Sequence, residues 1–188
     1  MTAADRSGEA SSRFRFCSRC GAASVRVESR LCHRCAGCGF GHYVNPIAGV
    51  VALLTDAAGR LLLLRRAQEP GRGRLGLPGG FVDIGESAEE ALQREIREEV
   101  GLKVPELAYY LTLPNEYPYQ GLVTPVLDLF YRGWLQSFAE ARAVSEVEEL
   151  VVLDPREVDL AQMAFASNAE AVRRLAAARP TSPISSSI

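Results

Sequence analysis

The stretch GFVDIGESAEEALQREIREEVGL, residues 80–102, decides the fold. Ser87 followed three residues later by Glu90 is a capping box, which marks the start of a helix, and Gly101 stands where a helix ends on a left-handed residue. Between these two signals, the apolar residues recur with the helical period. They form a single stripe: Ala88, Leu92, Ile96 and Val100. We therefore expect a helix that packs this stripe against a core.

Three acidic residues of this helix, Glu95, Glu98 and Glu99, share the stripe beside the apolar one. Carboxylates one turn apart repel each other by about a few tenths of a kcal/mol per pair on a bare helix. Arg94 can offset one of these charges, whereas a divalent cation such as Mg²⁺ offsets several and binds oxygen ligands together with substrate phosphates. For the helix taken alone, a solvated acidic face with Arg–Glu pairs is the commoner explanation.

The residues that precede the helix favour the metal site. Every fixed position of the Nudix box, Gly-x5-Glu-x7-Arg-Glu-U-x-Glu-Glu-x-Gly-U with U aliphatic, is filled: Gly80, Glu86, Arg94, Glu95, Ile96, Glu98, Glu99, Gly101 and Leu102. The chain thus resembles a Nudix hydrolase over most of residues 45–165. The resemblance implies an α/β (α+β) fold, with an α/β/α sandwich and a mixed sheet. It also implies Mg²⁺- or Mn²⁺-dependent cleavage of a nucleoside diphosphate linked to another group, by attack of water at phosphorus.

The same resemblance implies roles for individual residues. Glu95 and Glu99 would be the main Mg²⁺ or Mn²⁺ ligands, and the Gly79 carbonyl a further one. Glu98 would be a ligand or the general base, and Arg94 would orient Glu98 or its neighbours. Glu86 would brace the loop before the helix. Which residue acts as the general base stays open.

A further acid from outside the helix commonly completes such a site. The segment SEVEEL, residues 145–150, lies just before an expected strand and offers two candidates. We choose Glu146, as catalytic residue and metal ligand, and keep Glu149 in reserve. A solvated loop carboxylate explains either residue equally well, because only position along the chain supports the choice.

All five cysteines fall between residues 17 and 38. In a chain whose start lacks a signal peptide's apolar core, Cys-x-x-Cys pairs indicate a metal site rather than disulfides. A tetrahedral zinc takes four ligands, and a glycine usually follows the second Cys of a zinc-ribbon knuckle. This selects Cys17, Cys20, Cys35 and Cys38 as Zn²⁺ ligands. Cys32 and His33 then lie outside the first coordination sphere, with Cys32 in place of Cys38 as the alternative.

A zinc ribbon placed directly before a Nudix domain resembles the NADH pyrophosphatase branch, and Cys38 with Tyr43 fits that branch's Cys-x4-Tyr junction. Tyr43 is then a candidate substrate contact. The branch reads the nicotinamide ring with a Ser-Gln-Pro-Trp-Pro-Phe-Pro signature, whereas residues 113–120 here are LPNEYPYQ. Tyr117 or Tyr119 could still stack a base, or could merely anchor a loop. NADH, ADP-ribose and other nucleoside diphosphate derivatives are therefore all open as substrates.

The remaining sequence predicts interleaved strands, helices and loops. Strands are expected at about 47–54, 61–64, 106–113, 123–133 and 147–153. A loop over 68–80, a turn-rich insert at 114–121 and an Ala-rich helix at about 160–178 complete the elements. The predicted organisation is a disordered start (1–13), a zinc ribbon (14–42), a Nudix domain (43–178) and a disordered tail (179–188).

Composition limits the function classes. The chain of 188 residues is 47% apolar, enough for one ordinary core, and its longest apolar run is far shorter than the roughly 20 residues that span a bilayer. We expect a cytoplasmic protein with a nucleotide-type substrate and no membrane partner. Exposed aromatic residues around 109–119 make a homodimer plausible.

A binding module without turnover is the alternative to an enzyme. The chain would then be a nucleotide sensor, or its zinc ribbon would bind RNA. Residues 1–42 carry seven Arg against three acids, but four thiolates with one zinc ion add a charge of about −2, which halves this excess. Salt-sensitive RNA binding would support this alternative. A capped RNA as substrate would join the two hypotheses.

Overall fold

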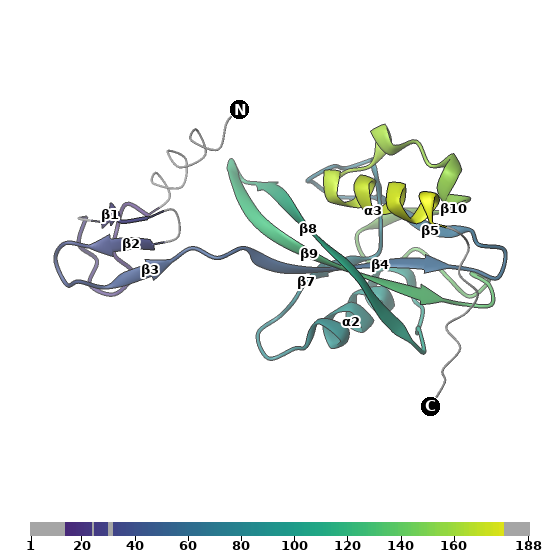
Figure 1. Cartoon of the computed structure of the whole chain (residues 1–188), viewed down its shortest axis with the longest axis horizontal. Coiled ribbons are helices and arrows are strands. Elements are labelled where there is room, and N and C mark those ends of the chain that lie inside the picture. Colours follow the sequence, from purple (N-terminus) through teal and green to yellow (C-terminus); the bar gives the residue numbers. More distant parts are fainter. Residues whose placement is uncertain (1–13, 24, 30–31, 179–188) are drawn as a thin grey trace. The chain divides into compact units, whose positions relative to one another are not determined.

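The computed structural model of the protein describes residues 14–23, 25–29 and 32–178. Both ends that the sequence predicts to be disordered, 1–13 and 179–188, lie outside the described residues. The chain divides into two compact units, Met1–Asn45 and Pro46–Ile188, and each is described here by itself (Figure 1). Among the described residues, no helix has the length and apolar character needed to cross a membrane.

The first unit contains a small antiparallel sheet. Its strands are β1 (Val25–Val27), β2 (Cys32–Cys35) and β3 (Gly41–Tyr43), in the order β1-β2-β3. Gly21 and Gly39 directly follow two of the cysteines and have φ of 73° and 72°, a conformation that glycine adopts without strain. These two tight turns bring the two Cys-x-x-Cys loops together.

The second unit is built on a seven-stranded mixed sheet with the order β10-β5-β4-β9-β8, to which β6 adds on β5 and β7 on β4. Its strands are β4 (Ile47–Thr55), β5 (Leu61–Arg66), β6 (Leu75–Gly76), β7 (Gly79–Phe81), β8 (Leu107–Tyr119), β9 (Leu122–Trp134) and β10 (Val147–Leu153). The pairing of β4 with β9 is parallel and the other pairings are antiparallel.

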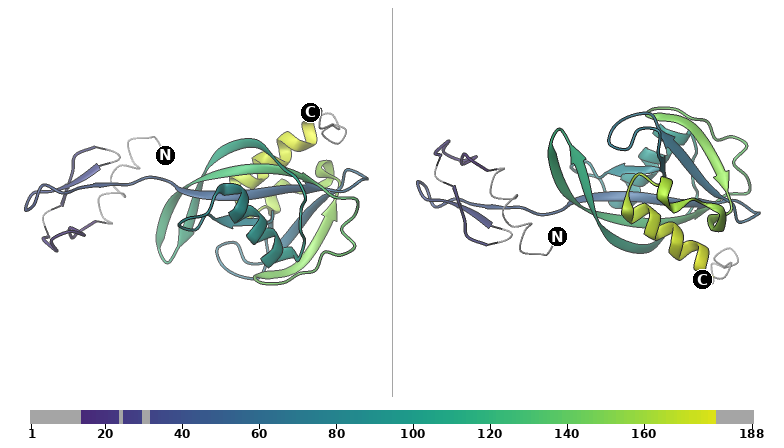
Figure 2. Two further views of the ribbon diagram at one scale, coloured as in Figure 1. Left: turned by 90° about the horizontal axis from the view of Figure 1, so that it is seen from below. Right: turned by 90° about the horizontal axis from the view of Figure 1, so that it is seen from above.

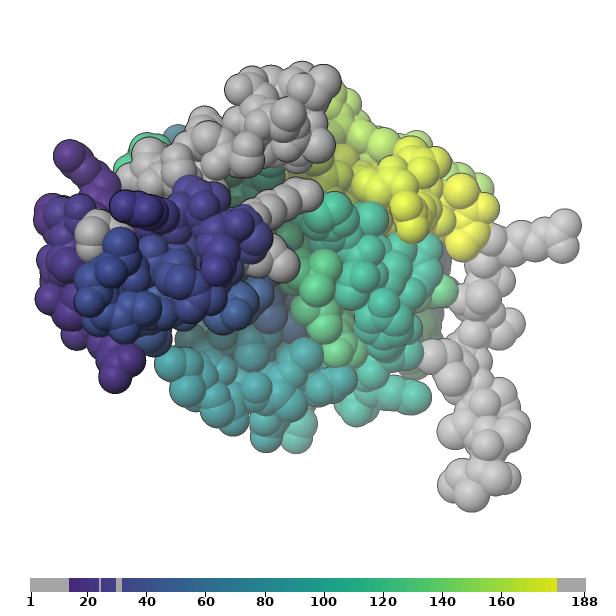
Figure 3. All heavy atoms as spheres, turned by 60° about the vertical axis from the view of Figure 1, so that its left-hand side comes forward, coloured from purple at the N-terminus to yellow at the C-terminus, as the bar shows by residue number. Residues whose placement is uncertain are grey.

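Two helices cover opposite faces of this sheet. They are α2 (Ala88–Val100) and α3 (Ala166–Ala177), and two short 3-10 turns, Pro155–Glu157 and Leu160–Gln162, precede α3. In Figure 2, α2 lies in front of the sheet in one view and α3 in the other. Figure 3 shows α3, in yellow, at the surface of the unit. The predicted α/β/α sandwich is confirmed.

The apolar run at the start of this unit forms a central strand buried on both faces. Successive side chains of a strand point to opposite faces. Val50 and Ala52 accordingly belong to the core under α2, whereas Val51 and Leu53 belong to the core under α3. This is why the strand is continuously apolar rather than alternating.

Two expectations for the strands were wrong. Residues 114–119, predicted as a turn-rich insert, continue β8, and the chain turns only at Gln120 and Gly121. β8 is the edge strand of the sheet, where Pro114 and Pro118 are tolerated because not every N–H needs a partner. The predicted loop at 68–80 includes β6 and β7, two short strands that are visible only through their pairing with β5 and β4.

The second helix begins at Ala166, six residues later than predicted. The Ala164 N–H donates to the Leu75 carbonyl at 2.7 Å, and Met163 forms a parallel bridge with Leu75. This pairing holds the chain extended up to Phe165 (φ −125°, ψ 138°). The delayed start leaves the Phe165 side chain at the edge of a cavity.

Candidate functional site

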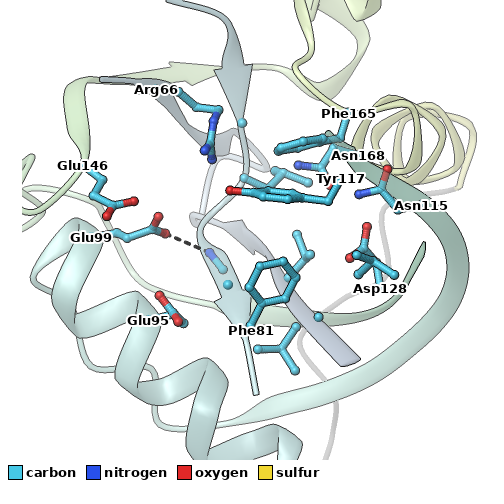
Figure 4. Close-up of a pocket in the computed structure, with 18 of the residues that line it drawn as sticks. Arg66, Phe81, Glu95, Glu99, Asn115, Tyr117, Asp128, Glu146, Phe165 and Asn168 are labelled. Atoms are coloured by element: carbon cyan, nitrogen blue, oxygen red, sulfur yellow. Dashed lines mark hydrogen bonds between the residues drawn. The ribbon is translucent and has the colours of Figure 1, made fainter. Parts of the chain in front are cut away.

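A cavity of about 310 Å³ opens in the second unit, between β4, β7, the carboxylate side of α2 and the start of α3 (Figure 4). One wall is acidic and carries Glu95, Glu98, Glu99 and Glu146. The opposite end is aromatic and amide-rich and carries Phe81, Asn115, Tyr117, Asp128, Phe165 and Asn168. The cavity therefore has two chemically different ends.

Helix α2 presents the acidic wall as the sequence predicts. Ser87 and Glu90 form the reciprocal capping box, and Gly101 ends the helix with φ of 67°. The apolar stripe packs under the sheet, so the adjoining face carries its glutamates toward the cavity.

Glu99 is the most buried carboxylate of this wall, with 8% of its surface exposed. The Gly79 N–H donates to Glu99 Oε2 at 2.8 Å. Burial, and then the nearby Glu95 and Glu146 carboxylates, raise the pKa of Glu99 to about 8, whereas the Gly79 N–H and Arg66 act in the opposite direction. A positive neighbour would favour the charged form of this buried carboxylate.

Arg94 connects the loop before α2 to the acidic wall. Its guanidinium donates to both carboxylate oxygens of Glu86 at 2.8 and 2.9 Å, to Glu95 Oε1 at 2.7 Å and to the Phe81 carbonyl at 3.0 Å. Its contact with Glu98 is longer, 3.5 Å. Arg94 thus holds Glu95 firmly and leaves the exposed Glu98 more freedom. Glu86 anchors the guanidinium and also accepts from the Asp83 N–H at 3.1 Å.

Gly80, the first glycine of the box, lies so close to the Glu95 side chain that there is no room for a Cβ. A Cβ at this position would collide with the carboxylate of Glu95. Gly79 is more constrained, because its φ is 150° and a Cβ there would collide with the Val50 carbonyl. The two glycines let β7 pass close enough to α2 for the Gly79 amide to reach Glu99.

The loop before β10 brings Glu146 to the cavity. Its amides cap the C-terminal turn of α2: the Ser145 N–H donates to the Glu98 carbonyl at 3.1 Å, and the Val144 N–H to the Glu99 carbonyl at 3.0 Å. Glu146 itself has a left-handed φ of 61° and lines the cavity. The reserve candidate, Glu149, instead pairs with Arg65 at 2.6 Å and is not among the lining residues.

The three tyrosines predicted to bind substrate lie in different environments. Tyr117 lies in the cavity, where Phe165 stacks on its ring at 5.7 Å and Phe81 meets it edge-on at 5.2 Å. Tyr119 is 54% exposed and is not among the lining residues. Tyr43 ends β3 in the first unit and is exposed. The substrate roles of all three tyrosines stay predictions.

Sequence reasoning missed the polar end of the cavity. Asp128 is buried within β9, and the Ser167 hydroxyl donates to its Oδ2 at 2.6 Å. Burial raises the pKa of Asp128, and hydrogen bonds from Ser167 and Asn115 oppose this. The available signal was a lone acidic residue in the apolar strand segment VLDLF, 126–130. Arg66 and Phe165 carried no comparable signal, because their roles depend on the packing of distant segments.

In the first unit, the four selected cysteines form one cluster. Cys17 Sγ lies 3.8 Å from Cys38 Sγ, and Cys20 Sγ lies 3.7 Å from Cys35 Sγ. All four sulfurs lie within 4.8 Å of one another. Tetrahedral Zn–S bonds of about 2.3 Å place sulfurs about 3.8 Å apart, so the cluster fits a zinc ribbon.

The fifth cysteine has a different partner. The Cys32 thiol is buried and donates to Glu28 Oε2 at 3.3 Å. Burial and this carboxylate raise its pKa. Within the part of the chain that the structure describes, the cysteine cluster is the one group of three or more potential ligand atoms gathered this tightly.

A family model described as the NUDIX domain matches residues 45–175, which include the glutamate helix, its glycine loop and the whole cavity wall. The chain belongs to the Nudix family. This agrees with the filled box and with the sandwich architecture.

Other Nudix proteins resemble the chain in sequence and fold. It is 30% identical over 112 residues to the NAD-capped RNA hydrolase NudC of Haemophilus influenzae, which covers 58% of this chain and 42% of that protein. It is 33% identical over 114 residues to the ADP-ribose pyrophosphatase of Methanocaldococcus jannaschii, covering 60% and 64%. A solved Nudix hydrolase from Nitrosomonas europaea matches 87% of this chain and 91% of its own, with a TM-score of 0.69 and 25% identity.

The chain therefore spans about two fifths of the length of its NudC relative. These relatives are named as a hydrolase and a pyrophosphatase.

Proposed function

We propose that this protein hydrolyses the diphosphate bond of a nucleoside diphosphate linked to another group, with NADH, ADP-ribose or an NAD-capped RNA as the substrate class. The acidic wall facing an aromatic, amide-rich end in one cavity carries this proposal. The wall suits a diphosphate with its cation, and the other end suits a base or ribose. The two sequence relatives, named for NAD-capped RNA and ADP-ribose, support the same class.

The donor set of the acidic wall fits Mg²⁺ or Mn²⁺. It offers only oxygen ligands, which these hard cations prefer, and the burial of Glu99 leaves its charge in need of a positive partner. Glu95, Glu99 and Glu146, with the Gly79 carbonyl, would hold the cation, and Glu98 would be a ligand or the base. A bound cation would supply charge neutralisation at the diphosphate.

The chain's own residues would orient the reaction. Arg94 holds the Glu95 carboxylate and the Gly79 N–H holds that of Glu99. Glu98, exposed and only weakly bound to Arg94, is free to accept a proton from a water molecule that attacks phosphorus. Cys17, Cys20, Cys35 and Cys38 would bind a structural Zn²⁺ that stabilises the first unit. The homodimer and the cytoplasmic location stay predictions.

A substrate panel tests this proposal. NADH, ADP-ribose, FAD, dinucleoside polyphosphates, nucleoside triphosphates and NAD-capped RNA are incubated with Mg²⁺ or Mn²⁺ in ¹⁸O-labelled water, and the products are identified by mass. We expect a mononucleotide product, with the label on one of the two phosphates that separate. Glu98→Gln serves as the matched variant and should lose most of the activity. Absence of any mononucleotide from the whole panel would contradict the proposal and favour a sensor or RNA-binding module.

A further inference from the structure

Arg66, the last residue of β5, is the one basic side chain among the described residues that line the cavity. The other charged lining groups are acidic: Glu95, Glu98, Glu99, Glu146 and Asp128. A diphosphate carries anionic oxygens, which such a lining repels. Arg66 is therefore the one charged lining group among the described residues whose sign suits a phosphate.

The guanidinium of Arg66 is not neutralised by a carboxylate. Its neighbour Arg65 forms an ion pair with Glu149 at 2.6 Å, and Arg94 is bound by Glu86. Within the described ranges of the chain, Arg66 forms no ion pair with a carboxylate. Its Nε–H donates to the carbonyl of Pro70 at 2.7 Å, and the remaining donors of the fork are available for an anion.

The surrounding residues hold this side chain in position. The guanidinium carbon lies 5.2 Å from the centre of the Phe165 ring, a cation–π contact. The stem runs beside two glycines: a Cβ at Gly76 would lie 3.6 Å from Arg66 Cγ, and one at Gly71 would lie 3.7 Å from Cδ. An arginine fixed in this way loses little freedom when it binds an anion.

The hydroxyl of Tyr117 completes the arrangement. Figure 4 shows the Arg66 guanidinium and the Tyr117 hydroxyl pointing toward each other on the side of the cavity that faces Glu99. Burial raises the pKa of Tyr117, and Arg66 acts against this rise. The phenol thus keeps its proton at neutral pH and can donate it in a hydrogen bond.

We propose that Arg66 and the Tyr117 hydroxyl form a phosphate-binding subsite, which takes the non-bridging oxygens of a diphosphate opposite the acidic wall. The guanidinium offers two parallel N–H donors, a geometry that suits phosphate, and the phenol adds a third donor. The identity of the ligand as a diphosphate rests on the proposed function; the subsite itself rests on the free cation in the cavity.

Titration calorimetry with methylenediphosphonate tests the subsite, because this probe has the oxygens of a diphosphate and no cleavable P–O–P bond. At a fixed Mg²⁺ concentration, Arg66→Met should weaken binding of the probe about 10- to 100-fold. Arg65→Met is the matched control, since Arg65 adjoins Arg66 but pairs with Glu149, and it should leave the affinity within about twofold. Adenosine, which has no phosphate, should bind both variants as it binds the wild type.

Other outcomes of this experiment would also decide for or against the subsite. Equal affinity of Arg66→Met and wild type for methylenediphosphonate, an equal loss in both arginine variants, or no binding to the wild type overturns the subsite. If Arg66→Met does not fold, Arg66→Lys replaces it: it keeps the charge without the fork and should bind at least about threefold more weakly, whereas unchanged affinity overturns the proposal. If the wild type cleaves no nucleotide but its diphosphonate affinity depends on Arg66, the proposed function fails and the subsite stands.

Discussion

Replacing Glu99 by Gln should separate activity from stability. Gln keeps an oxygen that can accept from the Gly79 N–H, 2.8 Å away in the wild type, and removes the buried charge. Burial raises the pKa of Glu99 from 4.5 to about 8, so between these pH values the folded chain holds a proton that the unfolded chain has lost. The contribution of Glu99 to the free energy of unfolding without Mg²⁺ therefore falls as the pH rises through this window, by about 1.4 kcal/mol per pH unit.

The Glu99→Gln variant lacks this pH-dependent contribution to the free energy of unfolding. From pH 5 to pH 8, the unfolding free energy of Glu99→Gln minus that of the wild type should grow by roughly 3 kcal/mol in Mg²⁺-free buffer. Urea unfolding can be followed through Trp134, the single tryptophan of the chain, which lies at the end of β9 and reports on the second unit. Other carboxyl groups titrate in both proteins, so the difference isolates Glu99.

Mg²⁺ should reduce this difference in unfolding free energy, because it stabilises the wild type more than the variant, and the variant should lose hydrolytic activity. A gain in stability joined to a loss of activity is typical of a residue retained for function. Two parallel pH profiles would refute the reasoning, because Glu99 would then ionise without a desolvation cost.

Three further substitutions test other parts of the molecule. Cys38→Ser should lose zinc, measured by metal analysis of the purified protein, and Cys32→Ser should retain it; the reverse would exchange these two ligands. Gly80→Ala places a methyl group against the Glu95 carboxylate, so hydrolysis should fall at least about tenfold while circular dichroism stays unchanged; wild-type activity would show that this carboxylate can move. Ser167→Ala removes the donor to a buried carboxyl on β9 and should lower the unfolding free energy by about 1–2 kcal/mol, and no change in urea midpoint would indicate a substitute donor.

Local signals predicted the box helix and its caps correctly. Ser87, Glu90 and Gly101 act within one turn of the helix ends, and the apolar stripe follows from the helical period. The glycine rule for zinc knuckles likewise selected the four clustered sulfurs over Cys32, because φ above zero after the second cysteine is a local requirement. Interactions between residues close in the chain leave their pattern in the sequence.

Two wrong predictions, at 114–119 and at the start of α3, have the opposite cause, because contacts with distant segments determine these elements. The strand at 114–119 forms because β9 offers it a partner, although its two prolines are typical of a turn. The delayed start of α3 depends on Met163 and Ala164 pairing with Leu75, nearly 90 residues earlier. Neither partner could be inferred from the residues near the element itself.

The sequence by itself determined the family, the glutamates and the two Cys-x-x-Cys loops, since each depends on short spacings that the chain enforces locally. Tertiary structure alone decided which outlying groups join the glutamates. It placed Glu146 at the cavity and turned Glu149 toward Arg65, and it brought Arg66 and Phe165 together from opposite ends of the unit. A spacing in the sequence describes neighbours along the chain, whereas a binding cavity forms where distant segments pack.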